Sequence, residues 1–144
     1  MAAIVDDGGA VRLQSRAGRD MTSRFPQMAA ALARLGPGAI VDGELVASAE
    51  GRMNFGALQR FQPGRPPPVG VSLSYVAFDV LRVRGEDVRG RPLRERVSAG
   101  LLDGLGPQIQ PVLSTPDRPT ALAWMTGLVA HGGRSRNQRV GHNL

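Results

Sequence analysis

Hydrophobic and polar positions alternate over several short segments of the chain, a pattern typical of β-strands with one buried face. Residues 2–6 and 10–16 show this alternation on either side of an Asp-Asp-Gly-Gly turn, which predicts a β-hairpin. The alternation is clearest over residues 39–48. There it predicts one apolar face and an opposite face that carries Asp42 and Glu44 side by side.

The longest apolar run covers residues 71–83 and is rich in valine and aromatic residues, so we expect a central strand there. Asp79 interrupts this run, and a carboxylate in apolar surroundings needs a partner. A shorter strand is expected near residues 108–113. The proline-rich segment 62–70 predicts an irregular loop. These strands place a sheet at the centre of the fold.

Helical spacing of apolar residues predicts several short helices between the strands. The first spans residues 27–35, the second spans residues 54–60 after an asparagine cap, and the third spans residues 92–101 after a turn at 85–87. A fourth is expected over residues 117–130. We expect these helices to pack against the sheet.

The composition is that of a globular domain. With 144 residues the chain has the size of one domain, and 19 glycines and 11 prolines indicate many turns and exclude a coiled coil. No apolar run reaches the roughly 18 residues of a membrane span, and the N-terminus lacks the basic start of a secretion signal. We therefore expect a cytoplasmic protein without membrane contact. Because cysteine is absent, a metal would have to be bound through carboxylates.

The net charge is +6, and all 18 basic residues are arginine, since the sequence contains no lysine. An arginine-rich surface favours phosphate partners, because the guanidinium group binds phosphate through two parallel hydrogen bonds. Arg16 and Arg19 flank Gly18 and could hold a phosphate in this way, but a basic turn on a solvated surface is the commoner meaning of such a pair. A base-composition bias explains the missing lysines, with nucleic-acid contact as a compatible consequence.

Asp42 and Glu44 are the strongest candidate site in the sequence. Two neighbouring carboxylates could bind Mg²⁺ or accept hydrogen bonds from the hydroxyl groups of a sugar. The glycine between them would let a ligand or another strand come close. Such residues also occur on ordinary strands that face solvent, so spacing alone leaves both interpretations open.

Several segments, taken together and in order, resemble the adenylation domain of ATP-dependent DNA ligases, especially those of the bacterial repair type. They are LQSRAGRDMT (13–22), FP (25–26), VDGELV (41–46), FGALQR (55–60), YVAFDVL (75–81), GED (85–87) and RPLRER (91–96). The resemblance makes residues 1–132 a partial adenylation domain and leaves residues 133–144 as a disordered, non-matching basic tail. It implies an α+β fold, with a twisted, mostly antiparallel sheet and short helices. This would be an incomplete version of the nucleotidyltransferase domain that DNA ligases share with mRNA-capping enzymes.

The resemblance also implies roles for individual residues. Arg16 falls on the Ser-Arg-x-Gly element, which contacts nucleotide and nucleic-acid phosphates. Glu44 falls on the Asp-Gly-Glu strand, whose glutamate holds the ribose hydroxyl or the metal region, and Phe78 falls on the Phe-Asp strand, whose ring stacks on adenine. ATP and Mg²⁺ as cofactors and nicked duplex DNA as partner follow from the same resemblance. So does nick sealing in DNA repair and recombination through an enzyme-AMP intermediate.

The chain departs from the family at the nucleophile. Family members react first through a lysine, in a Lys-x-Asp-Gly element upstream of the opening hairpin, which attacks the α-phosphate of ATP. Arginine cannot replace that amine, because the guanidinium group does not lose its proton. The chain contains no lysine, so we assign no catalytic residue and expect no self-adenylation.

The similarity ends at residues 132–133, and neither the expected Glu-Gly block nor the oligonucleotide-binding domain of the family follows. We therefore expect the middle of a ligase adenylation domain that starts late and finishes through an altered reading frame. One alternative is a non-catalytic basic module that binds nucleotide or DNA, which salt-dependent DNA binding would support. The other is a remnant without function, which the lack of a cooperative thermal transition would support.

Overall fold

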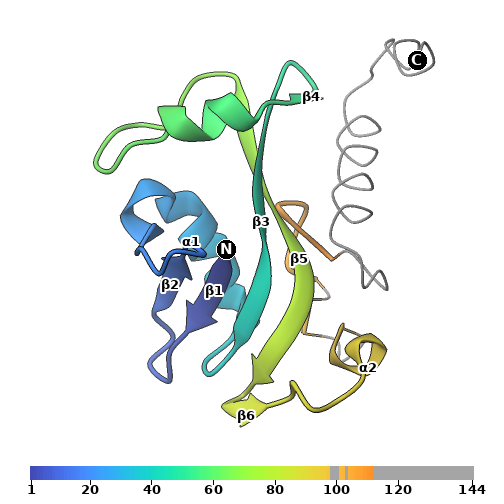
Figure 1. The fold of residues 1–144 in the computed structure, drawn as a ribbon. Coiled ribbons are helices and arrows are strands. Elements are labelled where there is room, and N and C mark those ends of the chain that lie inside the picture. Colours follow the sequence, from blue (N-terminus) through green and yellow to red (C-terminus); the bar gives the residue numbers. More distant parts are fainter. Residues whose placement is uncertain (98–100, 103, 112–144) are drawn as a thin grey trace, which may run out of the picture.

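The computed structural model describes residues 1–97, 101–102 and 104–111. In chain order its elements are β1 (Ala2–Val5), β2 (Val11–Gln14), a 3₁₀ turn (Thr22–Arg24), α1 (Pro26–Leu32), a 3₁₀ turn (Ala33–Leu35), β3 (Ile40–Ala49), β4 (Arg52–Met53), a 3₁₀ helix (Phe55–Arg60), β5 (Val71–Val83), β6 (Glu86–Asp87), α2 (Leu93–Val97) and β7 (Ile109–Pro111). Within these residues seven strands form one sheet in the order β2-β1-β3-β5-β6, with β4 paired to β3 and β7 to β5. The long strands β3 and β5 form its centre (Figure 1).

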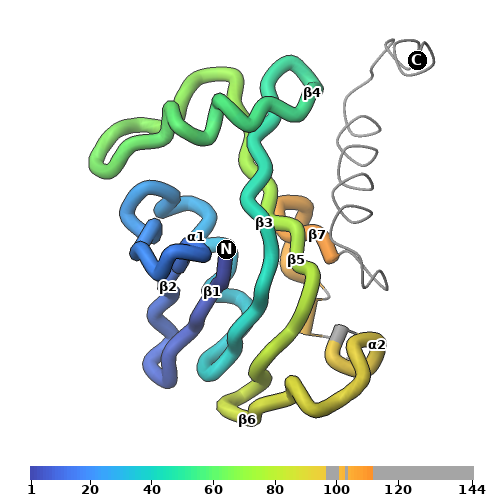
Figure 2. Tube along the Cα trace, in the orientation of Figure 1, coloured from blue at the N-terminus to red at the C-terminus, as the bar shows by residue number. Residues whose placement is uncertain are grey.

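The sheet is mostly antiparallel, as the sequence predicts. β1 pairs with both β2 and β3, and β3 pairs with β5, all in antiparallel fashion. β7 runs parallel to β5 and lies beside it, whereas α2 lies near the end of β5 that leads into β6 (Figure 2). Short helices accompany this sheet, so the expected α+β class is confirmed.

The β1–β2 hairpin forms because its turn satisfies its own backbone. The Asp6 Oδ1 atom accepts hydrogen bonds from two backbone amides of the turn, at 2.9 and 2.8 Å. Gly9 has a φ of 86°, a conformation that favours glycine. The resulting register places Ala3 opposite Leu13, and both are fully buried.

The hydrophobic core lies on one face of the sheet. β3 contributes Val41 and Leu45 to this core, and β5 contributes Tyr75 and Val80. The segment from α1 through the following 3₁₀ turn packs against the same core with the buried residues Met28, Leu32 and Leu35. The period-2 pattern of the strands and the helical pattern of this segment therefore specify the two sides of one core.

Two predicted helices differ from the structure in detail. The helix expected over residues 27–35 divides into α1 and a 3₁₀ turn, which ends at Gly36 with a φ of 87°. The helix expected over residues 92–101 is described for Leu93–Val97, and Leu101 lies in a turn but still packs against the core. Apolar spacing predicts which side chains are buried better than it predicts where a helix ends.

Two local signals have different outcomes. The asparagine cap is confirmed, because Asn54 Oδ1 accepts a hydrogen bond from the amide of Ala57 at 3.1 Å at the start of the 3₁₀ helix. The turn expected at residues 85–87 lies earlier, at Arg84 and Gly85, whose φ angles are 50° and 82°. Two successive positive φ angles match the twist of antiparallel strands, so the next two residues can pair with β5 as β6.

Some predictions fall outside the described residues. These are the helix over 117–130, the tail 133–144 and the end of the strand expected near 108–113, whose start is confirmed by β7. In the part of the chain that the structure describes, no helix has the length and apolar character needed to cross a membrane.

Candidate functional site

The face of β3 and β5 opposite the hydrophobic core, called the site face below, carries Glu44 and Phe78, two of the residues predicted to bind a ligand. Ala77 and Val80 of β5 both belong to the core although they are three residues apart. Regular alternation puts only every second residue on the same face, so Phe78 and Asp79 both leave the core side between them. The pairing of β5 with β3 is irregular at this point, which identifies a β-bulge.

Carboxylates from two neighbouring strands meet on the site face. Asp42 and Glu44 alternate with core residues of β3, so both side chains leave the sheet on this side. Asp79 lies directly opposite Asp42 on β5, and residues in such a pair have Cβ atoms about 5 Å apart. Phe78 is half-buried, lies outside the core cluster and precedes Asp79. The structure thus brings the predicted residues Glu44 and Phe78 to one face.

Gly43 is required by the packing of Tyr75 on the core side. A Cβ atom at Gly43 would lie 2.3 Å from the carbonyl oxygen of Val76 and 2.7 Å from the Tyr75 ring. The Tyr75 hydroxyl group donates to the carbonyl oxygens of Met1 at 2.8 Å and Val41 at 3.2 Å. The close approach that the sequence predicts at this glycine is therefore made by an aromatic ring of the neighbouring strand.

The electrostatics of this region keep the Tyr75 hydroxyl group neutral. The side chain is fully buried, and burial raises the pKa of the hydroxyl group. The negative charges of Asp42 and Glu44 raise the pKa of Tyr75 further. The neutral hydroxyl group is a hydrogen-bond donor, so it holds β1 and β3 together beneath the two carboxylates.

Arg16 is exposed in the turn after β2 and lines a hollow of about 370 Å³. Asp42, Gln14 and Ser15 line the same hollow. Glu44 and Phe78 do not line it. The structure therefore connects Arg16 with the site face through Asp42.

Arg96 supplies the partner that the sequence predicts for Asp79. The Nε and Nη2 atoms of Arg96 donate to Oδ1 and Oδ2 of Asp79, at 2.8 and 2.9 Å. The side chains of Arg96 and Asp79 are only 15% and 25% exposed. Donating hydrogen bonds to the carboxylate of Asp79 raises the pKa of Arg96. Arg96 therefore stays charged, and two parallel hydrogen bonds fix its guanidinium group on Asp79.

The carboxylates of the site face are suited to Mg²⁺ only as a partial ligand set. Among the residues that the structure describes, no three histidine, cysteine, aspartate or glutamate side chains are grouped to hold a metal ion. Proteins commonly bind Mg²⁺ through one or two carboxylates, with nucleotide phosphates and water as the remaining ligands. Glu44 and Asp42 match that smaller requirement.

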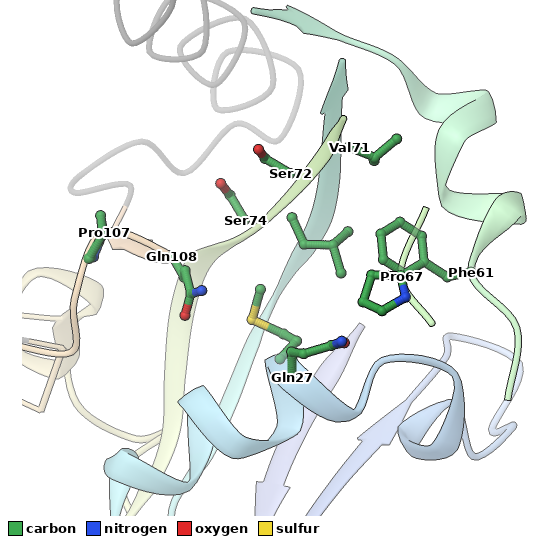
Figure 3. Close-up of a pocket in the computed structure, with 10 residues that line it drawn as sticks. Gln27, Phe61, Pro67, Val71, Ser72, Ser74, Pro107 and Gln108 are labelled. Carbon is green, nitrogen blue, oxygen red and sulfur yellow. The ribbon is translucent and has the colours of Figure 1, made fainter. Parts of the chain in front are cut away.

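A second hollow, of about 440 Å³, lies near the start of β5. Its lining includes Phe61 and Pro107 and is mainly apolar (Figure 3). None of Arg16, Glu44 and Phe78 lines this hollow. This hollow is larger than the one beside Arg16, but the predicted chemistry lies elsewhere.

The sequence did not single out Tyr75 and Arg96 as parts of the site. Tyr75 is one of several large residues in an apolar run, and its spacing gives no sign that its ring covers Gly43. Arg96 is 17 positions from Asp79, so no local pattern connects the two residues. The break in alternation before Asp79 is the signal that could have revealed the bulge.

Several known proteins that are similar in sequence to this chain are DNA ligases. Residues 2–102 match the ATP dependent DNA ligase domain. DNA ligase C2 of Mycolicibacterium smegmatis is 37% identical over 126 residues, which cover 82% of this chain and 36% of that protein. The multifunctional non-homologous end joining protein LigD of Pseudomonas aeruginosa is 45% identical over 93 residues, which cover 62% of this chain and 11% of that protein.

Solved structures show the same relationship. The ligase domain of LigD from M. tuberculosis superposes with a TM-score of 0.57 and 29% identity, over 85% of this chain and 39% of that structure. Mycobacterial DNA ligase D complexed with ATP and MES superposes with the same TM-score of 0.57, over 85% of this chain and 40% of that structure. The chain spans well under half the length of these relatives. With more than two thirds of its residues matched to one domain, including β3 and β5, the chain belongs to the ATP-dependent DNA ligase family.

Proposed function

We propose that the site face forms one wall of the ATP-binding site of a DNA ligase, and that the whole protein seals nicks in duplex DNA. The observation that carries this proposal is the placement of Phe78, Glu44 and Asp42 on one face, with an exposed arginine beside Asp42. An adenine nucleotide needs an aromatic surface, acceptors for its sugar hydroxyls and a cation for its phosphates. The site face and the neighbouring Arg16 together offer all three kinds of group.

Each proposed role follows from the chemistry of the side chain. Phe78 stacks on adenine, because its ring leaves the core side at the bulge. Glu44 accepts a hydrogen bond from a ribose hydroxyl group or holds Mg²⁺ against the phosphates. Arg16 contacts the phosphates through its planar guanidinium group, which is exposed at the hollow it shares with Asp42.

We propose no covalent bond between this chain and AMP. A bond between enzyme and AMP requires an amine that can lose its proton, and the sequence contains arginine but no lysine. We therefore expect the chain to bind ATP reversibly. Incubation with α-labelled ATP and Mg²⁺ should leave the denatured protein without label. Label that survives denaturation would contradict this expectation.

Nucleotide titrations test the proposed roles directly. Phe78→Leu should lower the affinity for adenosine and for ATP by about tenfold each, because one stacked base contributes about 1–3 kcal/mol. Arg16→Gln should lower the affinity for ATP and leave the affinity for adenosine unchanged, since adenosine has no phosphate. Arg65→Gln, in the exposed loop before β5, is the matched control and should change neither affinity. Equal affinities for all these variants would refute the proposed site.

The positive charge of the chain favours a second candidate function, which is DNA binding without catalysis. The net charge is +6 and is carried by arginine alone, which suits contact with phosphates. This function predicts DNA affinity that falls steeply with salt and does not respond to Phe78→Leu. Competition of ATP against labelled DNA separates the two functions, since only a shared site gives mutual displacement.

A further inference from the structure

We infer that Arg96 is a positioning residue for the nucleotide site. It fixes the bulge that carries Phe78, and its positive charge offsets the negative charge of Asp79 on the face that would receive ATP. This inference rests on the function proposed above for the site face. It concerns a residue of α2, outside the strands that form that face.

The bulge needs a contact from outside the β3–β5 ladder. At Phe78 the register between β5 and β3 shifts, and an extra residue in one strand interrupts the ladder hydrogen bonds that fix its neighbours. Phe78 immediately precedes Asp79, so the backbone position of Asp79 determines where the Phe78 ring lies. Any group that holds the carboxylate of Asp79 therefore also holds the ring.

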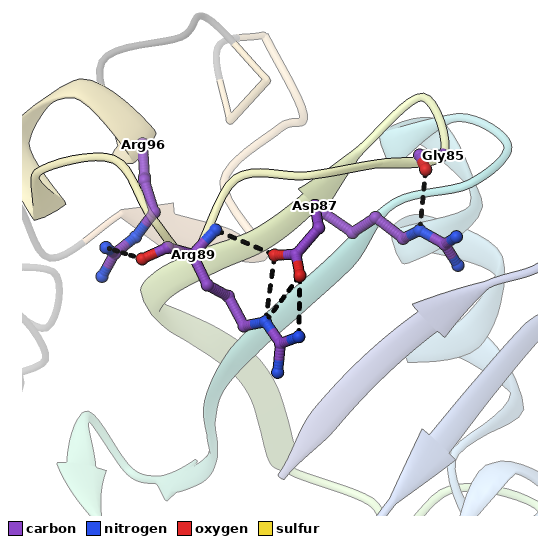
Figure 4. Close-up of polar contacts among 5 residues, drawn as sticks. Gly85, Asp87, Arg89 and Arg96 are labelled. Atoms are coloured by element: carbon purple, nitrogen blue, oxygen red, sulfur yellow. Dashed lines mark hydrogen bonds and ion pairs between the residues drawn. The ribbon is translucent and has the colours of Figure 1, made fainter.

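Arg96 makes that contact with its whole guanidinium group. Nε and Nη2 donate to the two carboxylate oxygens of Asp79, at 2.8 and 2.9 Å. Nη1 donates to the carbonyl oxygen of Arg89 at 3.2 Å (Figure 4) and also to that of Arg91. One side chain thus links the bulge, the loop after β6 and α2. A lysine could not form this fork, since an ammonium group lacks the planar arrangement of donors.

The same contact changes the charge of the site face. Asp42 and Asp79 lie opposite each other, and Glu44 lies two residues along β3, so the face carries three carboxylates. ATP brings further negative charge to this face. Pairing with Arg96 offsets one of the three carboxylates, and this lowers the repulsion that the phosphates meet.

Fluorine NMR tests the positioning role without any nucleotide. The sequence has four phenylalanines, so a chain labelled with fluorophenylalanine gives four signals, of which Phe78→Leu identifies one. Arg96→Gln should shift or broaden that signal and leave the other three in place. Arg94→Gln, an exposed arginine on the same helix, is the matched control and should change none of them. If Arg96→Gln unfolds the chain, all four signals collapse, and the milder Arg96→Lys replaces it.

Ligand titrations then separate the effect of the Phe78 ring position from the effect of the Asp79 charge. Arg96→Gln should lower the affinity for adenosine about tenfold, as expected for a lost charge-assisted contact. It should lower the affinity for ATP roughly threefold more, because the phosphates meet the unpaired charge of Asp79. Arg96→Lys keeps the positive charge but not the two parallel hydrogen bonds, so it should lower the affinities for adenosine and ATP by the same factor. Arg94→Gln should leave the affinity for adenosine unchanged.

Two results would overturn the inference. One is a Phe78 signal that does not change in any folded Arg96 variant. The other is an unchanged adenosine affinity in both Arg96 variants of a chain that binds adenosine. If the unaltered chain binds neither adenosine nor ATP, the proposed function of this chain fails, and the fluorine signal of Phe78 alone decides whether Arg96 holds the bulge.

Discussion

Tyr75 alone should determine how the stability of the fold depends on alkaline pH. The sequence has one tyrosine, no cysteine and no lysine, so this hydroxyl group is the side chain that titrates between about pH 9 and pH 12. Burial raises the pKa of Tyr75 above its ordinary value of 10.0. Ionised tyrosine is therefore favoured in the unfolded chain. The contribution of the neutral hydroxyl group to the free energy of unfolding is fully present below pH 10.0 and should be lost as the pH rises above that value.

The size of the effect follows from the single proton involved. While the folded hydroxyl group stays neutral, each pH unit above 10.0 should lower the free energy of unfolding by about 1.4 kcal/mol. Tyr75→Phe removes the hydroxyl group that donates to the carbonyl oxygens of Met1 and Val41, which should cost about 1–2 kcal/mol at neutral pH. The variant has no proton to lose, so the two stability curves should converge near pH 11.

Urea unfolding from about pH 8 to about pH 11, followed by circular dichroism, measures this convergence. Ultraviolet absorbance of tyrosinate gives a second readout of the same group, since Tyr75 is the only tyrosine. Tyrosinate should form only as the protein unfolds. Ionisation of Tyr75 near pH 10.0 in a chain that stays folded would refute the reasoning, because it would show that the hydroxyl group is not buried.

Two further substitutions test the packing of the fold. Gly43→Ala places a Cβ atom 2.3 Å from the carbonyl oxygen of Val76, so the free energy of unfolding should fall by about 3 kcal/mol or more, seen as a lower urea midpoint. Gly90→Ala is the control, because a Cβ atom there meets no atom within 4 Å, and it should leave the midpoint unchanged; an unchanged midpoint for Gly43→Ala would contradict the close approach. Arg24→Met keeps the apolar stem but loses hydrogen bonds of 2.7 and 3.1 Å to two carbonyl oxygens, so thermal unfolding should occur at a lower temperature by several degrees, about 1–3 kcal/mol. Arg65→Met should leave that temperature unchanged.

The sheet could be predicted because strand alternation is a local property of the sequence. The strand expected over residues 39–48 is found at Ile40–Ala49, and the strand over 71–83 has the predicted bounds. Helix type depends on smaller differences in backbone energy, so the segment 27–35 divides into α1 and a 3₁₀ turn. β6 is only two residues long, which is too short for any periodicity to reveal.

The site could be predicted only where it depends on single strands. Asp42 and Glu44 leave the core side because their neighbours on β3 enter it, and the sequence alone shows this. The partner of Asp79 depends on how α2 packs on β5, and the role of Gly43 depends on a ring from another strand. Such contacts join residues that are distant in sequence, and no pattern along the chain contains them.

The bulge resolves a conflict that the sequence itself contains. If alternation continued unbroken from Tyr75 and Ala77, Asp79 would enter the hydrophobic core, where an unpaired carboxylate is strongly unfavourable. One extra residue, Phe78, reverses which residues of β5 face the core, so that Val80 enters the core and Asp79 leaves it. The reversal also places an aromatic ring beside the carboxylates. Core formation and the geometry of the proposed nucleotide site therefore depend on the same irregularity, and a change that restored regular pairing of β5 would disrupt both.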